Sequence, residues 1–281
     1  MNILESNKLS KYLSTGIVLI FASILAVVFI VPMLYILTSS LKSVDNIFTV
    51  PMKWIPDKIH LENFTEPLIK KNFIRYFINS SFIAIIVTGS TLFFSSLAGY
   101  SLAKFDYKGR NMLFILILVT MMVPIETTIV PLAIVVRKLG MMDNYYGLIL
   151  PVILSPFAIF WMRQFIITLP DAYAEAGRID GLGEFAIFWQ LIFPLCKPAV
   201  GALAIFTFMG NWNNLIWPMI VATSDNLRTI PVGLVAFEGE FFTPFNQLFA
   251  MSVLTILPTF VFFMFLRTKL IKGMAMVGIK G

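Results

Sequence analysis

Charged side chains are scarce in this sequence, at only 13% of its 281 residues. A soluble domain typically carries about 25% charged residues. Hydrophobic residues, in contrast, make up 58% of the chain. This composition argues against an ordinary soluble domain and indicates a protein whose helices face lipid.

Histidine and cysteine are nearly absent, because His60 and Cys196 are the sole residues of their types. A Cys/His zinc site and the H-E-x-x-H helix of a metalloprotease each need more of these side chains. A single cysteine also excludes a disulfide within the chain. We therefore expect no metal site and no catalytic residues.

The dipeptide Gly-Lys does not occur, so the phosphate-binding loop G-x-x-x-x-G-K-[ST] is missing. That loop supplies the backbone N–H groups and the lysine that hold ATP phosphates. If ATP drives this protein, another chain binds the ATP and Mg and hydrolyses the nucleotide.

Long stretches with almost no charge predict membrane spans. Each reaches the roughly 20 residues that a helix needs to cross about 30 Å of hydrocarbon. One of them contains a single acidic residue, Glu126, and still fits a span. The six predicted spans are 15–37, 77–101, 111–133, 147–166, 199–222 and 247–266. They predict an all-α integral membrane protein forming a single transmembrane domain over 1–281.

Basic residues in the short loops predict the orientation of these spans. They follow the second span and the sixth: Lys104, Lys108 and Arg110, then Arg267, Lys269, Lys272 and Lys280. By the positive-inside rule both groups lie in the cytoplasm, which places both termini there. The net charge of +6 thus reflects membrane topology rather than a patch for nucleic acid.

The loop at 170–198, between the fourth and fifth spans, is too polar to cross a membrane and too apolar to be fully solvated. Asp171 after Pro170 predicts a capped helix over about 171–179. Asp180-Gly181 predicts a turn, because glycine tolerates positive φ. A second helix from about Gly183 would place four apolar side chains on one face: Phe185, Phe188, Trp189 and Ile192. The small residues Ala174, Ala176 and Gly177 would let another protein approach.

From these patterns alone, an amphipathic helix pair that merely covers the bundle explains the loop equally well. The run Glu175-Ala176-Gly177, with Gly181 and Pro194 at the matching spacing, resembles the EAA loop of ABC importer permeases. That pattern is E-A-A, three residues, G, nine residues and I-x-L-P. The resemblance implies a coupling helix seated on an ATPase and formed by Glu175, Ala176, Gly177, Asp180, Gly181 and Pro194. The sequence departs from the pattern at Gly177, Leu191 and Phe193.

Four further stretches resemble the carbohydrate-uptake branch of this family. They are Leu97–Lys104 with Gly109-Arg110, Val123-Pro124 to Pro131, Asn211-Trp212-Asn213, and Gly273–Gly281. The resemblance implies a bacterial or archaeal cytoplasmic-membrane protein that imports a sugar or oligosaccharide. It also implies as partners a second homologous permease, two ATPase subunits and an extracellular solute-binding protein. The small residues in the first stretch are explained by helix packing.

Polar side chains inside the predicted spans are candidates for the solute path. Glu126 lies in the third span, and an ionisable residue there is costly unless it faces a cavity or a partner. Asn211, Trp212, Asn213 and Asn214 lie near the middle of the fifth. Amides and aromatic faces suit sugar hydroxyls and sugar rings. Structural hydrogen bonds between helices explain these residues equally well.

Three alternatives stand beside a sugar importer. An ABC permease for another solute would share the loop. An ion-coupled secondary transporter would need no ATPase, but it typically shows internal repeats, which we do not find. A membrane enzyme is disfavoured by the missing catalytic chemistry.

Overall fold

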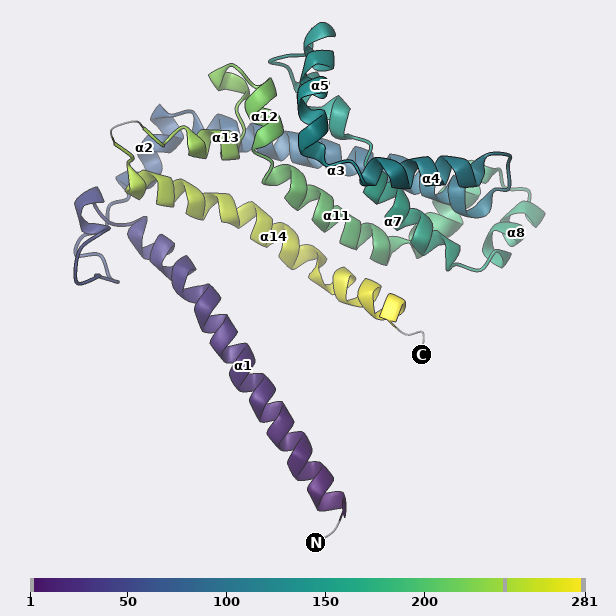
Figure 1. The fold of residues 1–281 in the computed structure, drawn as a ribbon, viewed down its shortest axis with the longest axis horizontal. Helices are drawn as coiled ribbons and strands as arrows, with labels where there is room; N and C mark the ends of the chain where they lie inside the picture. Colours follow the sequence, from purple (N-terminus) through teal and green to yellow (C-terminus); the bar gives the residue numbers. More distant parts are fainter. Residues whose placement is uncertain (1–2, 240–241, 279–281) are drawn as a thin grey trace. The chain divides into compact units, whose positions relative to one another are not determined.

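The computed structural model describes the backbone of residues 3–239 and 242–278, and the side chains of 15–239 and 242–265. Every regular element in this part of the chain is helical, which confirms the predicted all-α fold (Figure 1). The predicted C-terminal motif Gly273–Gly281 and the basic residues from Arg267 onward lie outside the described side chains.

Among the described residues, three helices are long and apolar enough to cross a membrane as single elements. They lie in α1 (Ile3–Ser39), α3 (Phe73–Lys104) and α14 (Phe245–Gly278). The qualifying parts are Thr15–Ser39, Phe73–Lys104 and Phe245–Phe265. The predicted first and second spans fall inside α1 and α3, and the sixth lies within α14.

The other candidate spans are bent pairs, which brings the possible total to six. Helices α4 (Arg110–Met121) and α5 (Ile125–Lys138) meet at 100°. Pro124 directly precedes α5 and has no N–H to continue a helical ladder, which explains the bend there. The segment Tyr145–Val152 meets α7 (Pro156–Ile167) at 40°.

The third bent pair brings the predicted loop onto the bundle, because Glu184–Leu195 meets Lys197–Val221 at 80°. The second part of that pair is itself interrupted, since α11 (Lys197–Trp212) ends three residues before α12 (Ile216–Val221). The predicted fifth span therefore contains a break at 213–215.

Shorter helices connect these elements. They are α2 (Glu62–Lys70), α6 (Tyr145–Ile149), α8 (Ala172–Ile179), α9 (Glu184–Ala186), α10 (Phe193–Leu195) and α13 (Ile230–Val235). Single 3-10 turns form at Val44–Asn46, Leu150–Val152 and Asp225–Leu227. A π-helical segment at Ile187–Ile192 joins α9 to α10.

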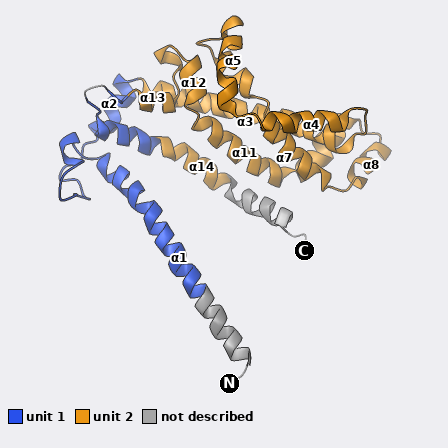
Figure 2. Cartoon of the chain, viewed as in Figure 1, with its two compact units in different colours: residues 1–71, 237–254 blue, residues 72–236, 255–281 orange. Residues whose placement is uncertain are grey.

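The chain divides into two compact units (Figure 2). The smaller unit comprises Met1–Lys71 and Phe237–Leu254. Its loop after α1 is folded around Lys42, which is 2% exposed and donates from Nζ to the Lys53 carbonyl at 2.5 Å. Asn63 donates to the carbonyls of Ser40 and Lys42 at 2.9 and 2.8 Å, so buried polar groups hold this loop together.

The larger unit comprises Asn72–Ala236 and Thr255–Gly281. Within it, α3 packs along both α7 and α11. The close approach depends on Gly99, where an added Cβ would lie 2.8 Å from the Arg163 backbone nitrogen. Ser95 and Ser96 on the same helix are fully buried. This confirms that the small residues of the second span serve helix packing.

Candidate functional site

The loop at 170–198 forms two helical segments joined by a sharp turn. The first, α8, covers the predicted range, and Gly181 adopts a φ of +78°, which confirms the predicted turn. The second runs from Glu184 to Leu195 and includes the π-helical segment. The predicted helix–turn–helix is thus confirmed in outline.

Asp171 does not cap α8, so that prediction was wrong. The residue occupies the N-cap position but makes no capping hydrogen bond with its side chain. Its carboxylate instead accepts a hydrogen bond from Lys104 Nζ at 2.6 Å. This bond and the lysine charge hold the pKa of the Asp171 carboxyl below its usual value.

The predicted apolar face of the second segment was also wrong. Phe188 and Ile192 are buried, whereas Phe185 and Trp189 are 62% and 48% exposed. The π-helical turn explains the difference, because it places residues five apart on one face instead of three or four. Accordingly Ile187 and Ile192 are both fully buried.

The small residues of α8 do not all face outward. Ala174 and Gly177 are buried, while Ala176 is exposed. A Cβ on Gly177 would lie 2.8 Å from Leu191 Cδ1 and 2.9 Å from Ile187 Cγ1. This packing gives a physical reason for glycine where the family pattern has alanine.

The outward face of α8 and its turn carries four of the six residues of the predicted docking set; Gly177 is buried, and Pro194 lies in α10, at the end of the second segment. Glu175, Ala176, Asp180 and Gly181 are exposed there. Tyr173 and Ile179 beside them are 48% and 86% exposed. The opposite face of α8 is buried through Ala174 and Gly177. The exposed face carries both apolar and acidic groups, and such a surface suits contact with another protein.

Arg178 and Glu184 connect the two segments of the loop. Arg178 Nε donates to Glu184 Oε1 at 2.7 Å. The same hydrogen bond lowers the pKa of the Glu184 carboxyl. It therefore fixes the end of α8 against the start of the next helical segment.

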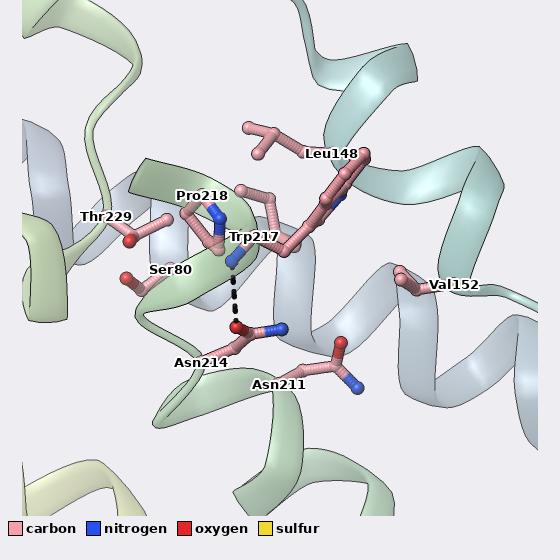
Figure 3. A pocket seen from close by; sticks show the side chains of 9 residues that line it. Ser80, Leu148, Val152, Asn211, Asn214, Trp217, Pro218 and Thr229 are labelled. Atoms are coloured by element: carbon pink, nitrogen blue, oxygen red, sulfur yellow. Dashed lines mark hydrogen bonds between the residues drawn. The ribbon is translucent and has the colours of Figure 1, made fainter. Parts of the chain in front are cut away.

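A second candidate site is a small, partly polar pocket of about 10 Å³, with room for about one water molecule, beside the break in the fifth predicted span (Figure 3). Its lining comes from α3, from the segment around α6, from α11 and α12, and from the residue before α13. The lining residues are Ser80, Ile83, Leu148, Val152, Asn211, Asn214, Trp217, Pro218 and Thr229. Two of the predicted asparagines, Asn211 and Asn214, are thus brought together.

Among the described residues, the amides of this segment bond to nearby backbone groups of the same stretch of chain. Asn211 and Asn213 donate to the carbonyls of Thr207 and Met209, one turn earlier in α11, at 2.8 and 3.0 Å. Asn214 accepts from the Trp217 backbone N–H at 3.3 Å, at the start of α12, as Figure 3 shows. These contacts are therefore not the interhelical asparagine bonds that the sequence left open.

The other predicted path residues lie elsewhere. Trp212 is 1% exposed, stacks on Phe208, and donates from Nε1 to the Thr255 carbonyl at 3.2 Å. Asn213 is exposed. Glu126 is exposed in the first turn of α5. None of these three belongs to the pocket lining.

Two pocket residues, Ser80 and Thr229, were missed by the sequence reasoning. Ser80 Oγ accepts the backbone N–H of Ile230 at 2.9 Å. Thr229 is 4% exposed, and its Oγ1 has no hydrogen-bond partner among the described residues. A single hydroxyl residue in a membrane helix or a loop is too common to stand out in a sequence.

Comparison with known proteins gives a family match over much of the chain. Residues 93–276 match the family described as "Binding-protein-dependent transport system inner membrane component". The match includes α7, the loop at 170–198, α11 and most of α14.

Curated relatives align over almost the whole chain. An arabinooligosaccharides transport system permease protein, AraQ of Bacillus subtilis, is 36% identical, covering 93% of this chain and 94% of the relative. AraQ of Halalkalibacterium halodurans is 34% identical over 98% and 99%. The sn-glycerol-3-phosphate transport system permease protein UgpE of Escherichia coli is 33% identical over 82% and 85%.

A solved structure shares the fold. It is described as a bacterial ABC transporter involved in the import of the acidic polysaccharide alginate. The TM-score is 0.81 at 22% identity, with 92% of this chain and 97% of the other covered.

Proposed function

Because the chain belongs to the family of inner-membrane components of binding-protein-dependent ABC transport systems, we propose that it forms half of the path for a sugar or oligosaccharide. Members of this family are multi-pass, non-catalytic transport components, and partner subunits hydrolyse the ATP. The proposed assembly contains a second homologous permease, two ATPase subunits and an extracellular solute-binding protein. Both termini are proposed to lie in the cytoplasm.

The observation that carries the proposed solute class is the likeness to the two AraQ permeases over more than nine-tenths of the chain, and the chemistry of the pocket agrees with it. Its lining is uncharged and combines two amides, two hydroxyl side chains and the Trp217 ring. Such groups suit the hydroxyls and apolar faces of a neutral sugar, and the pocket, at about 10 Å³, has to widen to admit one. A phosphate-bearing solute, such as the one in the name of the Escherichia coli relative, calls for cationic partners. The names of the two AraQ relatives support the same choice.

Uptake by the reconstituted complex tests this proposal. We expect transport of an arabino-oligosaccharide and no transport of glycerol-3-phosphate. Asn211→Ala and Asn214→Ala should each raise the KM for uptake several-fold, because each removes an amide from the pocket lining.

Asn213→Ala is the matched control, since it removes the same group from the same segment at an exposed position. If Asn213→Ala has the same effect as the other two, the path follows the whole segment and not the pocket. Unchanged uptake in all three variants, with the complex assembled, would refute a role for this segment.

We propose further that the outward face of α8 and its turn docks on the ATPase. The exposure of Glu175, Ala176, Asp180 and Gly181 supports this role. Gly181→Pro cannot keep the φ of +78°, because proline fixes φ near −65°. Both Gly181→Pro and Glu175→Lys should keep membrane insertion while reducing solute uptake per ATP hydrolysed. Normal uptake in either variant would count against docking at this face.

A further inference from the structure

The sequence motif Leu97–Lys104 has so far been explained by helix packing alone. Its last turn lies against the loop at 170–198 (Figure 1). Two of its side chains, Tyr100 and Lys104, are four residues apart, so they project from the same face of α3. Both make polar contacts with the loop.

Lys104 holds the beginning of α8. Its Nζ donates to the Leu169 carbonyl at 2.5 Å and to Asp171 Oδ1 at 2.6 Å. The Lys104 side chain is only 5% exposed, although Asp171 is 75% exposed. A buried ammonium group needs such partners, which makes this contact specific in position.

Tyr100 holds the other end of α8 through a relay. The Tyr100 hydroxyl donates to Glu184 Oε2 at 3.1 Å, and Arg178 at the end of α8 donates to the same carboxylate. Tyr100 is 3% exposed, and its ring packs on Phe188 at 5.4 Å between centroids. Helix α8 is therefore attached at both ends to a single turn of α3.

The covalent routes from the loop into the bundle are less direct. The loop reaches α7 through the non-helical residues 168–171, and it reaches α11 through the 80° bend at Cys196. Helix α3, in contrast, runs unbroken from Phe73 to Lys104. The 20 residues from Tyr100 back to Ser80 correspond to about 30 Å at 1.5 Å per residue. Ser80 lines the polar pocket.

We propose that α3 carries movement of the docking loop to the pocket, and that Tyr100 and Lys104 are the positioning residues that attach the loop to this helix. This rests on the docking role proposed above. When α8 is displaced by its ATPase partner, both of its ends pull on one turn of a rigid helix. The far part of that helix then moves the wall of the pocket that contains Ser80 and Ile83.

The test uses the full complex with its partner subunits in proteoliposomes, with solute uptake and ATP hydrolysis measured on the same samples. Tyr100→Phe removes one hydroxyl and keeps the ring, and Lys104→Met removes the ammonium and keeps the stem. We expect solute taken up per ATP to fall roughly tenfold, the factor that loss of a charge-assisted hydrogen bond produces in a two-state equilibrium. ATP hydrolysis should persist.

Matched controls come from the residues that follow the end of α3 at Lys104. Tyr107→Phe and Lys108→Met make the same chemical changes at exposed positions, and they should leave the uptake-to-ATP ratio unchanged. Tyr100→Phe combined with Glu184→Gln should be no worse than Glu184→Gln alone, because the bond that Tyr100→Phe removes ends on the carboxylate that Glu184→Gln already removes.

Glu175→Lys serves as a reference that reports on docking alone. If it uncouples transport while Tyr100→Phe and Lys104→Met keep a normal ratio, the transmission role of α3 is wrong and docking stands. If Glu175→Lys is normal, docking itself fails. A smaller yield of assembled complex with a normal ratio also overturns the proposal, because it shows a purely structural role. Should Lys104→Met fail to assemble, Tyr100→Phe decides alone.

Discussion

Two glycines of α3 receive opposite predictions for the same substitution. An alanine at Gly99 would place its Cβ 2.8 Å from the Arg163 backbone nitrogen and 2.9 Å from Met162 Cβ. Neither atom belongs to a flexible side-chain end, so α3 and α7 have to separate. Gly89 lies in the same helix with nothing within 4 Å of an added Cβ.

Both substitutions gain about 1 kcal/mol of helix propensity. At Gly99, overpacking opposes this gain by about 1–3 kcal/mol. The free energy of unfolding of Gly99→Ala should therefore lie about 1–3 kcal/mol below that of Gly89→Ala, which itself should be at or above wild type. The assay is denaturation of the purified complex in mixed micelles, followed by tryptophan fluorescence. Equal stability of the two variants would refute the close α3–α7 contact.

Three further predictions concern the loop and the pocket. Gly177→Ala should destabilise the loop because Leu191 and Ile187 have to move, and adding Leu191→Ala should reduce that loss; proteolysis rates at the loop measure both. Acidification should loosen α8, because the pKa values of Asp171 and Glu184 are lowered in the folded protein. The stability that these carboxylates contribute is fully present above their ordinary pKa values of 3.8 and 4.5. It is lost as the pH falls through the lower pKa values of the folded state. Hydrogen exchange of α8, corrected for intrinsic rates and compared with α11, checks this, and equal protection at neutral pH and at about pH 3 would contradict it. Trp217→Phe should weaken solute binding. It removes the Nε1–H that Trp217 donates to the Gly147 carbonyl at 3.1 Å, so the remaining phenyl ring is no longer fixed in the pocket lining. An unchanged KM for uptake would count against this.

Local patterns were sufficient to predict the features that depend on neighbouring residues. The turn at Gly181 follows from glycine alone, and the charge-free runs follow from the cost of burying charge in lipid. A proline also interrupts a helical ladder by its local chemistry, and the structure bends by 100° at Pro124. The same reasoning did not predict the environment of Glu126, which was a candidate for the solute path and is exposed in α5.

Features that depend on distant residues could not be predicted in this way. Asp171 was expected to cap its own helix, but its partner Lys104 lies 67 residues away in the sequence. The π-helical turn at Ile187–Ile192 buries its apolar residues against Tyr100 of α3 and Ala174 of α8, and the local pattern does not contain these contacts. Thr229 reaches the pocket because α13, which it precedes, packs beside α3.

Crosslinking tests most directly whether an ATPase docks on the outward face of α8. Cys196 is buried and is the one cysteine in the chain, so a single introduced cysteine reports on its own position in a Cys196→Ala background. Ala176 is exposed, and Ala174, on the same helix, is 2% exposed and faces the core. A thiol crosslinker applied to the assembled complex should join the ATPase subunit to Ala176→Cys and not to Ala174→Cys. Crosslinking at neither position, or equally at both, would refute docking of the ATPase at this face.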